Sequence, residues 1–415
     1  MQAIVLAAGE GSRMRPLTSR RPKVMLPVAG RPFLEHIILR ARYAGIDSFV
    51  IVVGYQGDHV RSHLGDGGRL GVQIDYAFQE RQLGTGHALM AARDLAEDSF
   101  VVLNGDVLAD TKDLKRVLQS SAPAVAAMRV PDPDRYGSFL LDGGSMKQVV
   151  EKSPNPPSDL ANAGIYLFNS KIFEVLEKVE FSKRREIELT DGLNALALQD
   201  KIGVVQLESW MEIGRPWDIL AANEALLQEV EPRVEGEVEP GASLKGRVSV
   251  GSNSIIRSGS YIVGPVIIKE GCDIGPNCYI RPGTSLGKNV RVGNAVEVKN
   301  STIMDGTKIG HLSYVGDSVI GEGCNFGAGT ICANLRHDKG SIKSFVKKER
   351  VNSGRRKLGV IMGDDVKTGI NTTIYPGTVI DSGFRGLPAA VLKGFVKSGE
   401  QEKETSAQTE LLKNC

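Results

Sequence analysis

The 415-residue sequence lacks the features that tie a chain to a membrane or to nucleic acid. Its apolar runs are far shorter than the ~20 residues that cross a bilayer. Its 51 Lys and Arg residues nearly balance its 49 Asp and Glu residues, so no overall charge favours nucleic acid or an anionic membrane surface as a partner. We therefore expect no nucleic acid and no membrane among its partners, and any partner must be recognised by a local group of residues.

Cysteine is also scarce, with five residues and no C-x-x-C pair. An odd number of thiols, clustered late in the sequence and without a secretory leader, is not the pattern expected of a disulfide-rich secreted domain. We expect reduced thiols, mostly buried as small apolar groups, in a cytoplasmic protein. They are Cys272, Cys278, Cys324, Cys332 and Cys415.

The length of the chain favours two domains, and residues 1–226 carry the pattern of the first. Short β-branched runs such as "AIVLAAG" and "SFVIVVG" alternate with helix-like segments such as "FLEHIILRARYAG". This alternation is typical of an α/β, Rossmann-like domain with a mostly parallel mixed sheet, whose active face lies at the carboxyl ends of the strands. The helical stretch "PWDILAANEALLQEV" is predicted to close this half, and residues 227–237 to form a polar linker.

After the linker the sequence repeats with a period of six. A strand has a period of two and an α-helix of 3.6, so a sustained period of six indicates a coil of short flat sides, each with one inward aliphatic side chain. Three such sides make one turn of a prism. The aliphatic residues are Val238, Leu244, Val250, Ile256, Ile262, Ile268, Ile274, Ile280, Leu286, Val292 and Val298.

The repeat is interrupted at defined places. It slips by one residue at Ile303 and again at Ile320, and a solenoid places loops or sites at such slips. Residues 335–359 break the pattern with a strongly basic insertion, after which the period of six resumes. We predict that the repeat domain spans residues 238–390 and that residues 391–415 form a polar tail.

The stretch "LAAGEGSRMRPLTSRRPKVMLPVAG" directly follows the first apolar strand. Its small residues let backbone N–H groups approach a phosphate chain, and Arg13 and Lys23 add positive charge. It is neither a Walker A motif nor the dinucleotide G-x-G-x-x-G motif. It resembles the signature of sugar-1-phosphate nucleotidyltransferases, G-x-G-[ST]-R-x-x-P-L-T with a later P-K. That resemblance implies catalytic roles for Arg13 and Lys23 and nucleotide contacts by Leu6, Ala8, Gly9 and Gly11.

Further stretches match the same family in order. "QERQLGTGHA" resembles its base-reading loop, which implies that Gln79 and the backbone near Gly84 read the pyrimidine while Gln82 and Thr85 shape the loop. "VVLNGDVL" resembles its metal-binding strand end and implies that Asp106 holds Mg²⁺. "WMEIGRPWDIL" resembles W-x-D-I-G-x-P, the source of a second metal ligand, with Glu212 in place of Asp.

Three more segments, "DRYGSF", "VVEKSP" and "ANAGIYLF", resemble the sugar-binding segments of that family. The resemblance implies sugar contacts by Gly137, Glu151 and Asn162, and a sugar-phosphate contact by Lys152. In the implied reaction, a phosphate oxygen of a sugar 1-phosphate attacks the α-phosphorus of UTP or dTTP, and pyrophosphate leaves. Two polyanions must meet, so positioning and charge neutralisation carry the catalysis.

The period of six resembles the left-handed parallel β-helix of hexapeptide acyltransferases, which implies a homotrimer. Within it, "GHLSYVGD", "NFGAG" and "CAN", together with "IRPG" and "VEVK", resemble the acetyltransferase site of the bifunctional bacterial enzymes that make UDP-N-acetylglucosamine. The resemblance implies that His311 is a general base and that acetyl-CoA, a co-substrate, lies against the backbone near Ala328. It assigns contacts with the sugar or its phosphate to Arg281, Lys299, Tyr314, Asn325 and Asn334.

A base is required because a protonated amine cannot attack a thioester, and imidazole accepts a proton near neutral pH. The basic insertion has no counterpart in the resemblance. It is either a solvated hairpin, or its charges bind the phosphates of acetyl-CoA or line a trimer axis. The charges are Lys343, Lys347, Lys348, Arg350, Arg355, Arg356 and Lys357.

The sequence thus predicts a bifunctional enzyme that acetylates glucosamine or galactosamine 1-phosphate and transfers a uridylyl group to the product. One alternative is a single-function glucose-1-phosphate thymidylyltransferase or uridylyltransferase with a structural β-helix, which the "RPLT" and "VVEKSP" strings resemble more closely. Another is a silent regulatory or assembly subunit, for which Glu212 is the only supporting feature.

Overall fold

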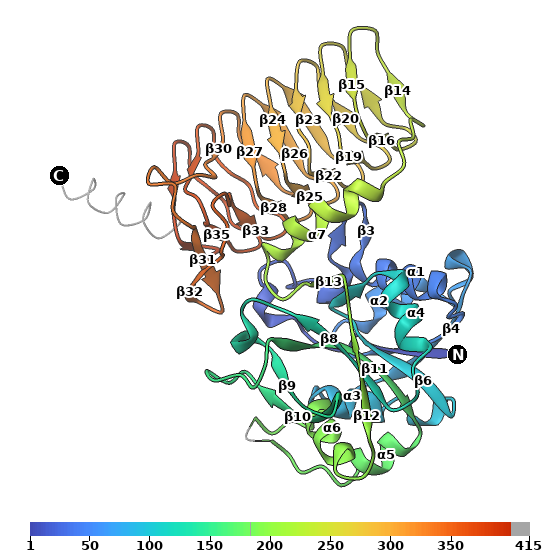
Figure 1. Ribbon diagram of the computed structural model, residues 1–415. Helices are drawn as coiled ribbons and strands as arrows, with labels where there is room; N and C mark the ends of the chain where they lie inside the picture. Colours follow the sequence, from blue (N-terminus) through green and yellow to red (C-terminus); the bar gives the residue numbers. More distant parts are fainter. Residues whose placement is uncertain (183, 400–415) are drawn as a thin grey trace, which may run out of the picture. The chain divides into compact units, whose positions relative to one another are not determined.

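The computed structural model describes residues 1–182 and 184–399, and these residues form two compact units (Figure 1). The first unit comprises residues 1–10, 21–25 and 32–212, and the second comprises residues 11–20, 26–31 and those from Ile213 onward. The first unit thus ends at Glu212, whereas the sequence pattern placed the end of the first domain at residue 226, and two short amino-terminal segments fold with the second unit. Most of the predicted polar tail, with Cys415, lies outside the described residues.

The first unit is built on a nine-stranded mixed sheet. In spatial order its strands are β5 (Gln73–Phe78), β4 (Ser48–Val53), β1 (Gln2–Leu6), β6 (Ser99–Asn104), β11 (Leu160–Asn169), β8 (Ala124–Arg129), β12 (Ile202–Gln206), β10 (Ser145–Glu151) and β9 (Gly137–Asp142). The first four are parallel, whereas β11 runs antiparallel to both of its main neighbours. The α/β class is confirmed, and parallel pairing dominates only the first half of the sheet.

Helices connect these strands and bury one face against them. They are α1 (Phe33–Ala44), α2 (Gly57–Leu64), α3 (Thr85–Met90), α4 (Thr111–Leu118), α5 (Lys171–Leu176) and α6 (Leu189–Ala197). Helix α1 shows why they form: Leu34, Ile37, Ile38 and Ala41 recur at helical spacing and are buried. It ends at Gly45, whose φ of 107° is a left-handed conformation that glycine adopts without strain.

The second unit is a parallel β-helix whose strands form three sheets, each named here after one of its strands. The β26 sheet contains β14 (Glu237–Val238), β17 (Ile255–Ile256), β20 (Asp273–Ile274), β23 (Arg291–Asn294), β26 (Lys308–His311) and β29 (Asn325–Phe326). The β27 sheet contains β15 (Ser243–Lys245), β18 (Tyr261–Val263), β21 (Tyr279–Ile280), β24 (Glu297–Lys299), β27 (Tyr314–Gly316), β30 (Ile331–Cys332), β34 (Thr373–Ile374) and β36 (Val391–Leu392). The β28 sheet contains β16 (Val248–Val250), β19 (Val266–Ile268), β22 (Thr284–Leu286), β25 (Thr302–Ile303), β28 (Val319–Ile320), β33 (Ile361–Met362), β35 (Val379–Ile380) and β37 (Phe395–Val396).

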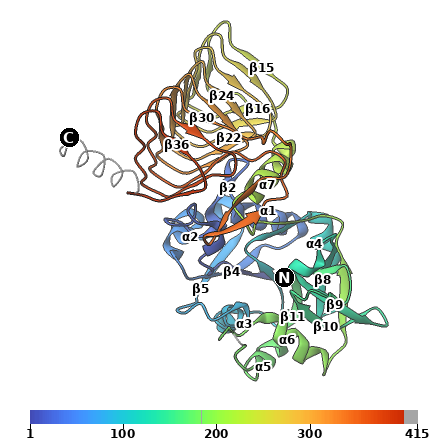
Figure 2. The same cartoon turned by 90° about the vertical axis from the view of Figure 1, so that its left-hand side faces the viewer.

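The register of these sheets confirms the period of six. Leu244 pairs with Ile262, Ile262 with Ile280, and Ile280 with Val298, so each coil is three repeats long. Val298 then pairs with Val315, one residue sooner, which is the slip seen in the sequence. The inward aliphatic side chains form one continuous core. Figure 2 shows the coils of the β-helix stacked on one another.

The basic insertion forms a hairpin of β31 (Lys343–Val346) and β32 (Glu349–Asn352). In the chain it lies between β30 and β33, and β33 still pairs with β28 in their sheet. Lys347 and Lys348 at its turn are exposed, whereas Phe345 contacts the ring of Phe395. Strands β36 and β37 also show that the coil continues to Val396, past the residue 390 predicted from the sequence.

Helix α7 (Asp218–Leu226) contacts β22 and β25 of the β-helix and β2 (Pro27–Val28). It therefore belongs to the second unit, although the sequence pattern placed it at the close of the first. Periodicity identified the helix but could not identify the surface that its apolar face covers.

The four described cysteines are buried and free of disulfides, as expected. Burial raises the pKa of Cys272 to about 11 and that of Cys332 to about 12, so both stay protonated and unreactive at neutral pH. Over the two described stretches, no helix is both long and apolar enough to cross a membrane.

Candidate active sites

Two carboxylates and a lysine meet beyond the carboxyl end of β6. Asp106 lies just before β7 (Val107–Ala109), and β7 pairs with β13 (Trp210–Glu212) so that Glu212 stands opposite Val107. This register brings the two predicted metal ligands to the same end of one strand pair. Lys23 forms an ion pair with Asp106, and both side chains are largely buried.

The glycine-rich loop runs past the same strand ends. The backbone N–H of Gly105 donates to the carbonyl of Leu6 (3.0 Å), and a Cβ at Gly105 would lie only 2.7 Å from that oxygen. A Cβ at Gly9 would meet nothing within 4 Å, so the backbone there borders open space. The loop then passes from the first unit to the second at Gly11, whose φ is 68°.

Arg13 lies in a 3-10 helix, Ser12–Met14, that belongs to the second unit, and its side chain is exposed. Lys23 belongs to the first unit. The two predicted catalytic cations of the loop are thus carried by different compact units, which no feature of the motif indicated.

The predicted base-reading loop is held by its own side chains. Gln79 is buried, and its Nε2 donates to the carbonyl of Gly84 (3.0 Å) and lies 3.0 Å from Nδ1 of His87. Gln82 is exposed and donates to the carbonyl of Ala8 (3.2 Å), and Thr85 Oγ1 accepts from the backbone N–H of Leu189 (2.9 Å). Gln79 therefore makes loop-holding contacts of the kind that the sequence assigned to Gln82, and base reading by Gln79 stays a prediction.

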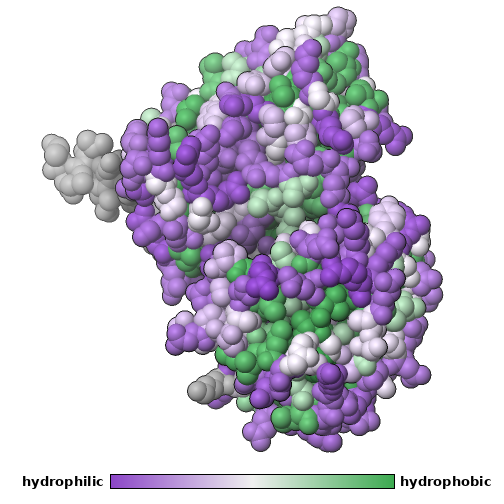
Figure 3. Space-filling view, in the orientation of Figure 1, coloured by the Kyte–Doolittle hydropathy of each residue, from purple (hydrophilic) through white to green (hydrophobic). Residues whose placement is uncertain are grey.

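The predicted sugar residues cluster around the β-bulge of β11. Asn162 Nδ2 donates to the hydroxyl of Tyr166 (2.9 Å), and the Asn162 Oδ1 accepts from the backbone N–H of Gly164 (3.1 Å). Burial raises the pKa of Tyr166, and the charges of Glu151 and Asp106 raise it further. Tyr166 therefore contacts one predicted sugar residue, Asn162, and the sequence motifs gave no indication of it. Figure 3 shows hydrophobic residues gathered around β8 and β11.

Gly137 and Glu151 stand opposite each other on β9 and β10. A Cβ at Gly137 would lie 2.8 Å from Glu151 Oε1, so only glycine leaves the carboxyl its place. Burial raises the pKa of Glu151, and the neighbouring Lys152 opposes that shift. Lys152 has a φ of 43°, and its N–H donates to the carbonyl of Tyr136 (3.0 Å).

On the β27 sheet, predicted site residues stack on successive coils around Asp317. The Asp317 carboxylate is buried and accepts from Lys299 Nζ (3.1 Å), Asn300 Nδ2 (2.8 Å) and Asn334 Nδ2 (2.5 Å). Asn334 also donates to the hydroxyl of Tyr314 (3.0 Å). Asp317 lies within "GHLSYVGD", but the sequence indicates no role for it, because nothing local shows that three donors converge on it.

Tyr314 and Arg281 complete this cluster. Burial raises the pKa of Tyr314, and the charge of Asp317 adds to the shift. Arg281 Nη1 donates to Glu297 Oε1 (2.8 Å), and its guanidinium lies 5.5 Å from the ring centre of Tyr279. The result is a hydrogen-bonded polar surface with two cations at its edge.

His311 lies at the end of β26, one sheet away from this cluster. Its side chain is exposed, and its carbonyl accepts from the Ser313 hydroxyl (2.7 Å) and the backbone N–H of Gly329 (3.4 Å). The stretch with Ala328 is therefore the neighbouring coil. Asn325 is exposed on that coil, paired with Lys308. Tyr314 follows His311 after a two-residue corner, so the predicted residues line two adjoining faces.

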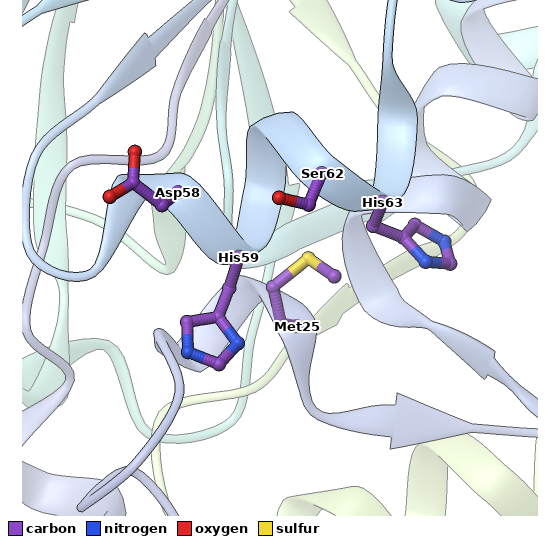
Figure 4. Close-up of a pocket in the computed structure, with 5 residues that line it drawn as sticks. All are labelled: Met25, Asp58, His59, Ser62 and His63. Atoms are coloured by element: carbon purple, nitrogen blue, oxygen red, sulfur yellow. The ribbon is translucent and has the colours of Figure 1, made fainter.

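A separate cavity of about 450 Å³ lies in the first unit, lined by Met25, Asp58, His59, Ser62 and His63. Figure 4 shows His59 and His63 on the same side of α2, on either side of Met25. His63 Nε2 lies 2.9 Å from the buried Glu35 carboxylate, which also accepts from Arg69 (2.8 Å). None of the predicted site residues lines this cavity.

Comparison with known proteins places the chain in a family. Residues 2–229 match the nucleotidyl transferase family, and residues 262–383 match the GMPPB C-terminal domain. The chain is 44% identical over 384 residues to the bifunctional protein GlmU of Methanocaldococcus jannaschii, covering 92% of each chain. It is 42% identical over 406 residues to a bifunctional sugar-1-phosphate nucleotidylyltransferase/acetyltransferase of Sulfurisphaera tokodaii, covering 96% of this chain and 99% of the other.

Two thymidylyltransferases are also similar to this chain. A glucose-1-phosphate thymidylyltransferase of Streptomyces griseus is 36% identical over 329 residues, which cover 77% of this chain and 92% of that protein. The crystal structure of a putative glucose-1-phosphate thymidylyltransferase from Bacillus anthracis matches 56% of this chain and 96% of its own, with a TM-score of 0.51 and 29% identity. The two bifunctional relatives match nearly the whole length of the chain. The chain is therefore an enzyme of the nucleotidyl transferase family and belongs with the bifunctional sugar-1-phosphate nucleotidylyltransferase/acetyltransferases.

Proposed function

We propose that the chain acetylates glucosamine or galactosamine 1-phosphate with acetyl-CoA and transfers a uridylyl group from UTP to the N-acetylhexosamine 1-phosphate. The observation that carries the proposal is that each compact unit holds its own polar cluster. In the first, Lys23, Asp106 and Glu212 lie at the strand ends. In the second, Lys299, Tyr314 and Asn334 surround Asp317.

The carboxylates of Asp106 and Glu212 would hold Mg²⁺. The described part of the chain contains no group of three or more His, Cys, Asp or Glu side chains placed to hold a metal ion. Two carboxylates suit Mg²⁺, which usually binds one or two of them and takes further oxygens from phosphates and water. The ion would supply positive charge that offsets the charge of the substrate phosphates. Lys23 would exchange its ion pair with Asp106 for the substrate phosphates, and Arg13 would add charge at the leaving pyrophosphate.

In the sugar site, Asn162 and Glu151 would hydrogen-bond the sugar hydroxyls and the acetamido group, and Lys152 would face the sugar phosphate. Gly137 supports this assignment because its missing side chain leaves room for the Glu151 carboxyl. Gln79, Gln82 and the loop from Gly84 to Thr85 would border the base of UTP or dTTP, beside the backbone of Leu6, Ala8, Gly9 and Gly11.

In the acetyl-transfer site, the substrate amine would attack the thioester carbon while His311 accepts its proton. The C–S bond breaks, and the proton passes to the departing CoA sulfur, so no other reactant is needed. Arg281, Lys299 and Tyr314 would bind the sugar phosphate. Asn325 and Asn334 would contact the sugar and its amine, and the backbone at Ala328 would face the thioester. The exposure of His311 supports this role, since its ring is open to a substrate.

We propose that the protein is a homotrimer with its acetyl-transfer sites between neighbouring β-helices. The outward positions of the β27 sheet support association, because this one sheet carries four large, exposed hydrophobic or aromatic residues, Tyr261, Tyr279, Ile331 and Val391. Sedimentation equilibrium tests the proposal, and a monomer at micromolar concentration would contradict it.

A single-function thymidylyltransferase or uridylyltransferase is the second candidate, favoured by the similarity to the Streptomyces griseus protein. Thiol release from acetyl-CoA with glucosamine or galactosamine 1-phosphate separates the two. No release with either sugar would leave nucleotidyl transfer alone, with the β-helix as an assembly domain.

Removing divalent cations with EDTA should lower pyrophosphate release by at least about 10²-fold, since a metal ion contributes several kcal/mol of charge stabilisation. Thiol release should not change, because we assign no metal to the second site. Added Mg²⁺ should restore the first activity. Equal loss of both activities would contradict the assignment of the metal to Asp106 and Glu212.

Asp317→Asn should raise KM for the amino-sugar 1-phosphate about tenfold, because a neutral amide cannot hold Lys299 and Asn334 as the carboxylate does. Uridylyl transfer should be unaffected. Asp273→Asn is the matched control: it removes the carboxylate that accepts from Arg257 (2.5 Å) on another coil. An unchanged KM in Asp317→Asn would show that the carboxylate does not organise the substrate site.

A further inference from the structure

The glycine-rich loop is carried in part by the β-helical unit. Residues 11–20, which include Arg13, and residues 26–31 belong to this unit, whereas the intervening residues 21–25 belong to the other. Lys23 is thus bracketed in the chain by two segments that pack elsewhere. The contacts of these two segments therefore determine the shape of the loop.

Asn223 of α7 holds the second of these segments. Its side chain is fully buried. Its Oδ1 accepts from the backbone N–H of Ala29 (2.8 Å) and from the Ser285 hydroxyl (2.6 Å), and its Nδ2 donates to the carbonyl of Gly283 (2.8 Å). One amide therefore joins the loop, the helix and a coil of the β-helix, and each buried polar group it satisfies would be costly to leave unpaired.

The first segment is anchored on the last coils. Arg20 forms an ion pair with Asp365, and both side chains are substantially exposed. Pro16 is buried beside Gly363, where a Cβ would lie 3.0 Å from the Pro16 Cβ. The backbone of Asp365 is itself held, because its N–H donates to the carbonyl of Glu322 (2.7 Å) and its carbonyl accepts from the Arg385 guanidinium.

We propose that Arg20 and Asp365 are positioning residues for nucleotidyl transfer: the pair on the β-helix holds the loop that carries Arg13 in its working shape. The inference rests on the proposed role of this loop in nucleotidyl transfer. Neither residue need touch substrate. A displacement of about 1 Å can lower a rate about 10²-fold when reacting groups must be aligned, so a surface ion pair outside the site can control the reaction.

The test is a charge exchange in the full-length protein: Arg20→Glu, Asp365→Arg and the double variant. Each variant is assayed for pyrophosphate release from UTP or dTTP with N-acetylglucosamine or glucose 1-phosphate, and for thiol release from acetyl-CoA. Hydrogen exchange of the amides of residues 11–20 is measured in parallel. Arg93→Glu is the matched control, because it breaks an ion pair with Glu177 of similar exposure, 47% and 52% against 59% and 42%.

We expect each single reversal to speed amide exchange in residues 11–20 and to lower kcat for pyrophosphate release about tenfold, with thiol release unchanged. The double variant should recover to within about threefold of the original protein, since the opposite charges face each other again. Unchanged exchange in the single variants would overturn the anchoring, and faster exchange with unchanged kcat would overturn the positioning role. If the original protein released no pyrophosphate, the proposed function would fail, while the exchange data would still decide whether the pair anchors the loop.

Discussion

Lys23→Ala should lower the rate of pyrophosphate release about 10³-fold and leave thiol release from acetyl-CoA unchanged. Lys23 contacts a predicted metal ligand through its ion pair with Asp106. In the reaction its ammonium would neutralise charge that develops on the phosphates, and removing one preorganised donor of this kind costs about 10²–10³ in rate. The loss should appear in kcat, because the contact strengthens in the transition state.

Lys112→Ala, which removes an exposed ammonium from α4, is the control. The thermal unfolding of Lys23→Ala should be measured as well, because the variant leaves the largely buried Asp106 without this ion pair. A folded Lys23→Ala variant with full uridylyl transfer would remove Lys23 from the mechanism. Loss of both activities in a folded protein would mean that the two sites are not independent.

His311→Ala should lower thiol release about 10²–10⁴-fold, the range expected when a general base is removed, and leave uridylyl transfer intact. The imidazole of His311 is exposed at the end of β26. The backbone N–H of Gly329, on the neighbouring coil, donates to the backbone carbonyl of His311. The truncation creates no buried cavity, so the fold should be unaffected. Added imidazole should restore part of the rate in the variant, which a merely structural loss would not allow.

His337→Ala is the matched control, since His337 is also exposed and lies in the same unit. Thiol release is followed with both glucosamine and galactosamine 1-phosphate. If His311→Ala kept its rate with each sugar, another group would have to accept the proton, and Tyr314 would be examined next. Its raised pKa, however, favours the neutral phenol over a base at neutral pH.

The two domains differ in how far local pattern could predict them. The β-helix could be predicted from residue spacing, because each short side of a coil carries one inward aliphatic residue. The stacked coils repeat the same spacing. In the first unit, alternation predicted strands and helices but not the antiparallel course of β11, since strand direction depends on which distant neighbours pair. Helix α7 was predicted as the close of the first half, and its contacts with β22 and β25 likewise depend on residues far along the chain.

The candidate sites divide in a similar way. By itself, the sequence determined which residue types could do chemistry, because glycines, cations and carboxylates kept a characteristic order along the chain. Only the tertiary structure decided that Asp317 gathers Lys299 and Asn334, because residues on three separate coils meet when the coils stack. It also decided that the glycine-rich loop is shared between two compact units and anchored through Asn223 and Asp365. The contacts of Asn223 with Ala29 and of Arg20 with Asp365 join residues 194 and 345 positions apart, so no local spacing encodes them.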